Sequence, residues 1–201
     1  MPDTGAPYFI PFADPTDLVR DWPALSEDVA EAVADGLDAA GGLVAVKSAI
    51  FTGTQVEANI VDGANFAVQD LEITHALADA SNKLIISAFL GVAASNDGRA
   101  PVGIAVHDGA NLIAIGDADG IRTRVTAGGF VAPSSGNFLV TMPSVTFVHT
   151  PNTTDSRTYT VRAINVDNAT RTLFINRTEN DSNAEFQPRA VSSLVIQEVK
   201  V

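Results

Sequence analysis

Three histidines are the residues in this chain that are best suited to bind a metal ion, and their spacing argues against a metal site. His75, His107 and His149 each lie near the end of an expected strand. A metal site would need two or three of them to converge with a carboxylate, and no His-x-His or His-x-x-x-His spacing is present. We therefore expect no metal site, and we interpret the histidines as hydrogen-bonded residues at strand ends.

The segment Asp117-Ala118-Asp119-Gly120 begins like a calcium-binding loop. The third acidic ligand and the bidentate glutamate that closes such a loop are missing, because Ile121-Arg122-Thr123-Arg124-Val125 follows. The segment therefore predicts a tight turn. Weak calcium binding at a contact between subunits is the alternative.

No complete set of catalytic residues stands out. Carboxylates are plentiful, so a glycosidase pair about 5–9 Å apart stays open on number alone, but nothing singles out two of them. Gly-x-Ser-x-Gly is absent, and Ser135-Gly136 lies in a Pro/Ser/Gly loop, which does not favour a nucleophile elbow. We expect no enzymatic activity and no cofactor.

The charge balance limits the partners. With 24 acidic and 12 basic residues, the formal net charge is -12. Nucleic acids and anionic membranes bind basic patches, and the arginines here form no cluster in the sequence. There is no cysteine, no secretion signal at the start and no apolar run of the ~18 residues that a membrane span requires. We expect neither nucleic-acid binding nor membrane insertion.

The first part of the chain reads as an arm, which we place at residues 1–42. Prolines between aromatic residues predict an extended segment over 1–13, which either docks on another protein or folds back on its own domain. Residues 14–42 predict a short amphipathic helix with a break near Pro23 and a stop at Gly41-Gly42. The arm's candidate docking residues are Tyr8, Phe9, Phe12, Leu18 and Trp22, and the helix stripe continues through Leu25, Val29, Val33 and Leu37.

The rest of the chain, residues 43–201, reads as one all-β head domain. About ten segments combine β-branched and aromatic residues between turn signals, which predicts an antiparallel sandwich of the jelly-roll type. A helix of the arm's length is marginal alone, so we expect the head to carry the assembly. The expected strands are 43–55, 71–78, 83–94, 101–107, 112–116, 121–131, 143–149, 157–166, 170–176 and 190–199.

Two stretches give the chain a family resemblance. Phe9-Ile10-Pro11-Phe12-Ala13-Asp14-Pro15-Thr16-Asp17, followed by the acidic helix and Ala39-Ala40-Gly41-Gly42-Leu43-Val44, resembles the start of small tail-fibre or minor tail proteins of bacteriophages and prophages. His107-Asp108-Gly109-Ala110-Asn111-Leu112-Ile113, Arg122-Thr123-Arg124-Val125 and the ending Leu194-Val195-Ile196-Gln197-Glu198-Val199 look like the head domains of that group. The resemblance implies a homotrimer whose jelly-roll heads are similar to the tumour-necrosis-factor and complement type.

Strand parity adds an expectation about the loops. If the strands alternate in direction and the arm joins the base, the hairpins 79–82, 108–111 and 167–169 lie at the base, with 132–142 as a long basal loop. The far tip then carries 62–70, 95–100, 117–120, 150–156 and 177–189. Polar loops on a rigid sandwich suit recognition of a host glycan or protein. The candidate receptor-binding residues are Asn96, Asp97, Arg99, Asn152, Thr153, Asp155, Asn180, Asp181, Asn183, Phe186 and Arg189.

The sequence as a whole predicts a virion structural protein. The first interpretation is a short trimeric tail fibre or receptor-binding protein, assembled in the host cytoplasm and attached to other virion proteins of the tail, baseplate or capsid. The alternatives are a capsid decoration protein or head fibre, and an enzyme that degrades surface polysaccharide.

Overall fold

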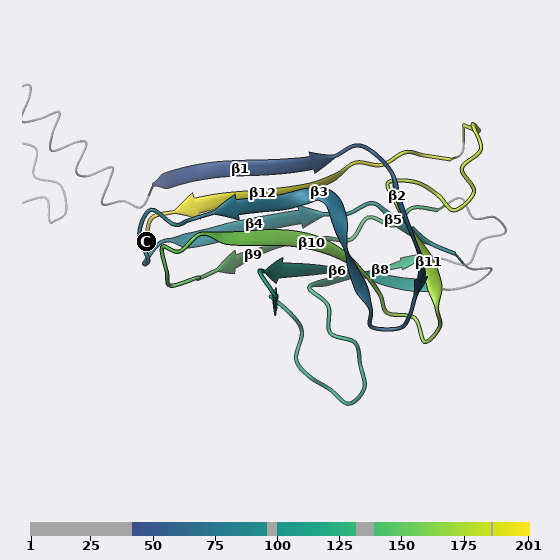
Figure 1. Ribbon diagram of the computed structural model, residues 1–201, viewed down its shortest axis with the longest axis horizontal. Helices are drawn as coiled ribbons and strands as arrows, with labels where there is room; N and C mark the ends of the chain where they lie inside the picture. Colours follow the sequence, from purple (N-terminus) through teal and green to yellow (C-terminus); the bar gives the residue numbers. More distant parts are fainter. Residues whose placement is uncertain (1–41, 96–99, 132–138, 186) are drawn as a thin grey trace, which may run out of the picture.

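The computed structural model describes residues 42–95, 100–131, 139–185 and 187–201. This part of the chain is all-β, as predicted, and forms a jelly-roll-like sandwich of antiparallel strands (Figure 1). It contains no helix long and apolar enough to cross a bilayer. The predicted arm helix, with its docking and stripe residues, lies outside the described residues, so the arm and the boundary at residue 42 stay predictions.

The first layer, sheet A, contains the first and the last strand of the head. Its strand order is β1-β12-β4-β9, with β1 at Leu43–Phe51, β12 at Ser192–Val199, β4 at Lys83–Phe89 and β9 at Ser144–His149. Burial alternates strictly along β4 and β12, which is the period-two pattern of a sheet with one face on the core. The backbone N–H of Lys200 donates to the Gly42 carbonyl at 2.9 Å, so Gly42 and the end of β12 meet at one end of the sandwich, which we call the arm end.

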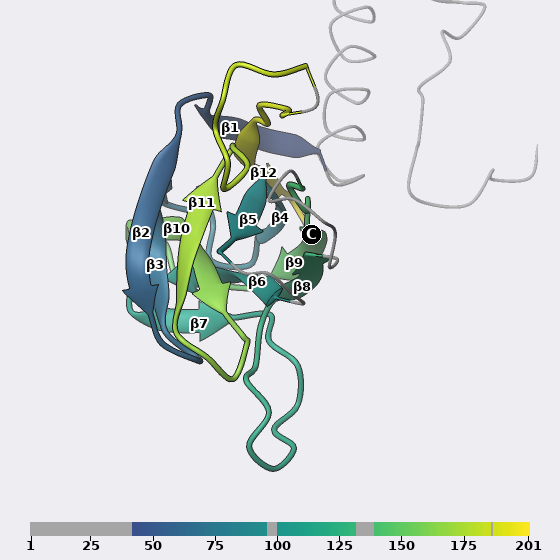
Figure 2. The ribbon, with the colours of Figure 1, turned by 90° about the vertical axis from the view of Figure 1, so that its right-hand side faces the viewer.

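The second layer, sheet C, packs against the inner face of sheet A (Figure 2). Its order is β3-β10-β6-β7, with β8 also paired to β6. The strands are β3 at Asn65–His75, β10 at Arg157–Asn165, β6 at Ala100–Asp108, β7 at Asn111–Ile113 and β8 at Ala127–Val131. A β-bulge lies in β3 opposite the Thr160/Arg162 step, and Asp70 there has a φ of 59°, a left-handed conformation that such irregularities accommodate.

A small third sheet, sheet B, stands at the opposite end of the sandwich, the far end (Figure 1). It pairs β2 (Gln55–Ile60), β11 (Arg171–Ile175) and β5 (Val92–Ala94) in the order β2-β11-β5. Asn176, just after β11, is fully buried and donates to the carbonyls of Phe51 and Gly53 while accepting from the Ser192 hydroxyl. Its amide thereby ties sheet B to the ends of β1 and β12.

One apolar core fills the space between the sheets. Sheet A contributes Leu84, Ile86, Leu194 and Ile196, each at most 1% exposed. The facing residues of sheet C and sheet B complete the core, including Leu71, Ile104, Val106, Val161, Leu173 and Ile175. Burying such side chains contributes about 1.5–3 kcal/mol each, so the core outweighs any single surface contact in stabilising the head.

The strand predictions were correct in type and wrong in several details. Twelve strands form among the described residues instead of about ten. The predicted strand 43–55 is divided, because β1 ends at Phe51 and β2 begins at Gln55. The predicted loop 62–70 contains the start of β3. The segment 83–94 splits at Leu90-Gly91, where the N–H of Leu90 bonds the Pro143 carbonyl instead of a strand partner. Only 127–131 of the predicted strand 121–131 is extended.

Candidate functional site

A buried carboxylate organises the arm end of the sandwich. Glu198 points inward from β12 and is 1% exposed. It accepts hydrogen bonds from Asn82 Nδ2 at 2.6 Å, from the backbone N–H of Ala78 at 2.7 Å and from His75 Nε2 at 2.8 Å. His75 belongs to β3, so this contact links sheet A to sheet C.

A second carboxylate, Asp108, also connects sheet C to sheet A. Asp108, at the end of β6, is 5% exposed and bonds both Arg157 Nη1 and His149 Nε2, the latter at 3.2 Å. His149 lies on β9 of sheet A and packs edge-on against the Tyr159 ring, with 5.8 Å between the ring centroids. Arg157 and His75 are register partners in the β10–β3 ladder, so the two carboxylates form one polar layer, the arm-end cluster: His75, Asn82, Asp108, His149, Arg157 and Glu198.

The protonation behaviour of the cluster follows from its contacts. Burial alone raises the pKa of Glu198, but the hydrogen bonds from Asn82, Ala78 and His75 outweigh it and hold that pKa below its ordinary value. Burial, reinforced by the negative charge of Asp108 and opposed by Arg157, raises the pKa of Tyr159 to about 12. Glu198 is therefore ionised and Tyr159 neutral at pH 7, which suits fixed hydrogen bonding more than proton transfer.

The third histidine lies apart from this cluster. His107 faces outward from β6, and its register partner on β10 is Thr160. Arg162 faces outward two residues further along β10. Burial and the charge of Arg162 lower the pKa of His107, with a backbone contact to Ala110 opposing them. The three histidines therefore do not converge, and the described residues contain no group of three or more His, Asp or Glu arranged to hold a metal ion.

The segment that begins like a calcium loop forms a turn, as predicted. The backbone N–H of Arg122 bonds the Asp119 carbonyl, and the Arg122 guanidinium pairs with the Asp119 carboxylate at 2.6 Å. Gly120 has a φ of 60°, the left-handed conformation that glycine adopts without steric cost. The turn lies in the loop between β7 and β8, which projects from the side of the sandwich (Figure 1).

A polar loop at the far end is held by ion pairs. Asp181 in the segment 177–185 accepts from Arg189 at 2.8 Å and pairs with Arg177 at 3.3 Å. Arg177 also stacks over the Phe174 ring, 5.4 Å from its centroid. These contacts anchor the loop to β11, and Asn180 and Asn183 remain exposed. Of the predicted receptor-binding residues, the structure thus groups Asn180, Asp181, Asn183 and Arg189.

The expected placement of several loops is wrong. β9 ends at His149 and β10 begins at Arg157, both at the arm end, so 150–156 with Asn152, Thr153 and Asp155 lies there and not at the tip. By the same ladders, 167–169 follows the far end of β10, and 139–143 precedes the far end of β9. The cause is β8, which runs in the same direction as β7 because both pair antiparallel with β6. Asn96, Asp97, Arg99 and Phe186 lie outside the described residues.

Comparison with known proteins gives no family. No protein-family profile and no curated protein matches the sequence. Among solved structures, the chain is similar to the infectious bursal disease virus VP2 subviral particle, with 11% sequence identity and a TM-score of 0.24. The match covers 80% of this chain, and the chain spans 42% of the length of that one.

The arm-end cluster was missed at the sequence level, although one signal was present. In the terminal strand, Leu194, Ile196 and Glu198 share one face by alternation, and the first two are apolar. A carboxylate at a core-facing position needs a buried partner, so parity alone indicates that Glu198 is hydrogen-bonded. Nothing in the sequence indicates that its partner is His75, which is 123 positions away.

Proposed function

We propose that this chain is a non-enzymatic virion structural protein, a short trimeric tail fibre or receptor-binding protein. In this proposal residues 1–42 attach it to other virion proteins of the tail, baseplate or capsid, and the head presents its far end to the host surface. The protein is assembled in the host cytoplasm and resides in the phage particle. The sequence resemblance to phage tail-fibre proteins supports this assignment.

The observation that carries the proposal is the polarity of the head. The chain joins the head at Gly42 and ends beside it, through the Lys200–Gly42 bond, at the arm end. Glu198 and Asp108 of the arm-end cluster are buried beneath that end, and the far end carries the loop held by Asp181. A rigid sandwich with its attachment at one end and ordered polar loops at the other is suited to display.

The chemistry of the far end favours a hydroxyl-rich ligand. Asn180 and Asn183 offer amide donors and acceptors, and Arg189 and Asp181 add a charged pair on the same loop. Such side chains match the alternating donors and acceptors of a glycan, so a host-surface saccharide is the ligand class that we propose, with a surface protein as the second choice.

The test compares two loop clusters at opposite ends. The triple variant Asn180→Ala, Asp181→Ala, Asn183→Ala should abolish binding of the full chain to host cells. The matched triple variant Asn152→Ala, Thr153→Ala, Asp155→Ala changes a polar loop at the arm end and should leave cell binding unchanged. Equal binding by both variants would refute recognition at the far end.

The second candidate is a capsid decoration protein or head fibre, since the same polarity would serve attachment to a shell. Imaging of particles that carry a tagged copy separates the two assignments. Density at the tail tip supports the first, and density distributed over the capsid supports the second. Release of reducing sugar from host polysaccharide would contradict both and favour an enzyme.

A further inference from the structure

The outer face of sheet A lacks charge over its whole centre. Four adjacent strands contribute three aligned rows of outward side chains, which the register places side by side. Six are apolar: Val46, Ile50, Ile85, Phe89, Val148 and Val195. Six are small or neutral polar: Ser48, Ser87, Ser144, Thr146, Ser193 and Gln197. We call these twelve residues the uncharged face.

The burial pattern fixes which way these side chains point. In β4 and β12 the alternate residues are buried in the core, and in β9 Val145 and Phe147 pack against it. The twelve residues lie between those positions and are half-buried or exposed, with Ile50 at 59% and Val148 at 61%. Lys47, the charged residue of β1, reaches the Thr74 carbonyl of sheet C and so points away from the uncharged face.

The outer face of sheet C, in contrast, carries charged side chains. The outward positions of β3, β10 and β6 include Glu72, Arg162 and His107. Strand spacing and rise give the uncharged face an area on the order of 400 Å². The absence of charge over this area distinguishes it in a chain whose net charge is -12. The largest apolar patch on a typical monomer covers about 300–600 Å² and is often functional, so a face of this extent is a candidate contact site.

We propose that the uncharged face is the contact between copies of this chain, which rests on the homotrimer of the proposed function and locates its interface. Two acidic copies repel at charged surfaces, and this face removes that repulsion at the point of closest approach. In a threefold ring each copy presents one surface to a different surface of its neighbour, and an uncharged face requires no opposite charge on the surface that covers it. Toward the arm end the next row begins with the exposed apolar residue Leu43, and its register neighbours are Val199 and then Lys83, where the uncharged face ends. The uncharged face supplies about half of the roughly 800 Å² per partner that is usual for a stable interface.

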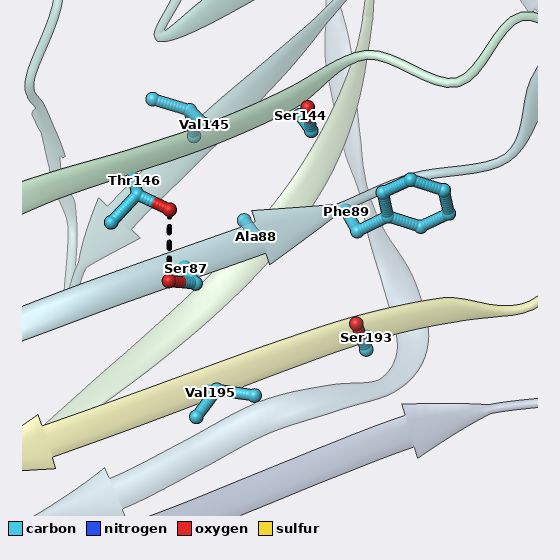
Figure 3. Close-up of a pocket in the computed structure, with 8 residues that line it drawn as sticks. All are labelled: Ser87, Ala88, Phe89, Ser144, Val145, Thr146, Ser193 and Val195. Atoms are coloured by element: carbon cyan, nitrogen blue, oxygen red, sulfur yellow. Dashed lines mark hydrogen bonds between the residues drawn. The ribbon is translucent and has the colours of Figure 1, made fainter.

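The face also has relief for a partner's side chain. A shallow depression of about 330 Å³ lies over Ser87, Ser144 and Ser193, with Phe89 and Val195 on its rim (Figure 3). The hydroxyls of Ser87 and Thr146 bond each other at 2.9 Å across the strands. Since these hydroxyls already have a partner, an apolar side chain of a neighbouring copy can cover them at low desolvation cost.

The test places one charge on each outer surface of the full chain. Ser87→Glu removes a cross-strand hydroxyl bond on an interior strand of sheet A, and Thr158→Glu removes the matching bond, Thr158 to Thr74 at 2.9 Å, on an interior strand of sheet C. Light scattering with size-exclusion chromatography should give a trimer of the 20.9 kDa chain for the wild type and for Thr158→Glu. Ser87→Glu should weaken association at least about thirtyfold, because its charge is buried without a partner.

Val148→Glu provides a second probe on the exposed edge strand β9, where a folding defect is least expected, and circular dichroism confirms the fold of each variant. Dissociation of either sheet A variant, with the Thr158→Glu trimer intact, supports the interface. A monomeric wild type, or trimers of both folded sheet A variants, would overturn it. Cell binding by the far-end loop is measured separately, so the proposed function can fail or stand independently of this result.

Discussion

At the scale of single residues, Glu198 is the position where charge and fold are most tightly coupled. Glu198→Gln keeps the shape of the side chain but replaces one acceptor oxygen with a donor facing Asn82, Ala78 or His75. We expect the free energy of unfolding at pH 7 to fall by about 1–3 kcal/mol, since a buried donor loses its partner. Urea unfolding measures the loss.

The same residue predicts a dependence on pH. Because the pKa of Glu198 is lowered in the folded protein from its ordinary 4.5, the unfolded chain takes up its proton first on acidification. The stabilisation is therefore complete above the ordinary value and is lost as the pH falls through the folded value. The difference between wild type and Glu198→Gln should shrink below pH 4.5, with exposed Glu72→Gln as the control. A difference that stays constant with pH would contradict this.

Asn176 gives a second prediction at this scale. It has a φ of 58° and three side-chain hydrogen bonds, two of them buried, whereas Asn152 has a φ of 56° and is exposed. Both alanine variants strain the left-handed backbone by about 1–2 kcal/mol, and Asn176→Ala also leaves buried partners unpaired, at about 1–3 kcal/mol each. Thermal unfolding should therefore show a much larger loss for Asn176→Ala. Equal losses would mean that the buried bonds contribute little.

At the scale of elements, the loop that follows β11 depends on the two ion pairs of Asp181 and on the stacking of Arg177 over Phe174. Asp181→Asn removes the carboxylate that Arg177 and Arg189 share. Partly exposed ion pairs contribute at most about 1 kcal/mol, so the melting temperature should change little, while hydrogen exchange in 177–185 should become faster. Asp155→Asn, in the arm-end loop, is the control. Unchanged exchange after Asp181→Asn would show that the stacking of Arg177 on Phe174 suffices.

Elements also show what the sequence could and could not predict. Alternation in β4, β10 and β12 was readable, because each strand has one face on the core. The break at Leu90-Gly91 was not, because it depends on Pro143, far along the chain. The chain leaves β7 and enters β8 in the same direction, because both strands are antiparallel to β6. The hydrophobic pattern of a strand carries no information about its direction. One such loop inverted the expected positions of 150–156 and 167–169, although 79–82, 108–111 and 177–185 kept theirs.

At the scale of the whole molecule, the first and last strands of the head depend on each other. Ala49 pairs with Leu194, 145 residues further along the chain, and β12 lies between β1 and β4 in sheet A. Such non-local pairing closes late and predicts slow folding, on the millisecond-to-second scale. It also means that sheet A has no complete core face until the final strand is in place.

This dependence predicts opposite results for truncation at the two ends. A chain that ends at Val191 loses Leu194, Ile196 and both ladders of β12; two such core losses alone cost about 4–10 kcal/mol, comparable to the total stability of a domain. It should show no cooperative melting transition by circular dichroism. A chain that begins at Gly42 keeps every described strand and should melt as the full chain does. A cooperative transition in the chain ending at Val191 would show that sheet C and sheet B fold without sheet A being completed.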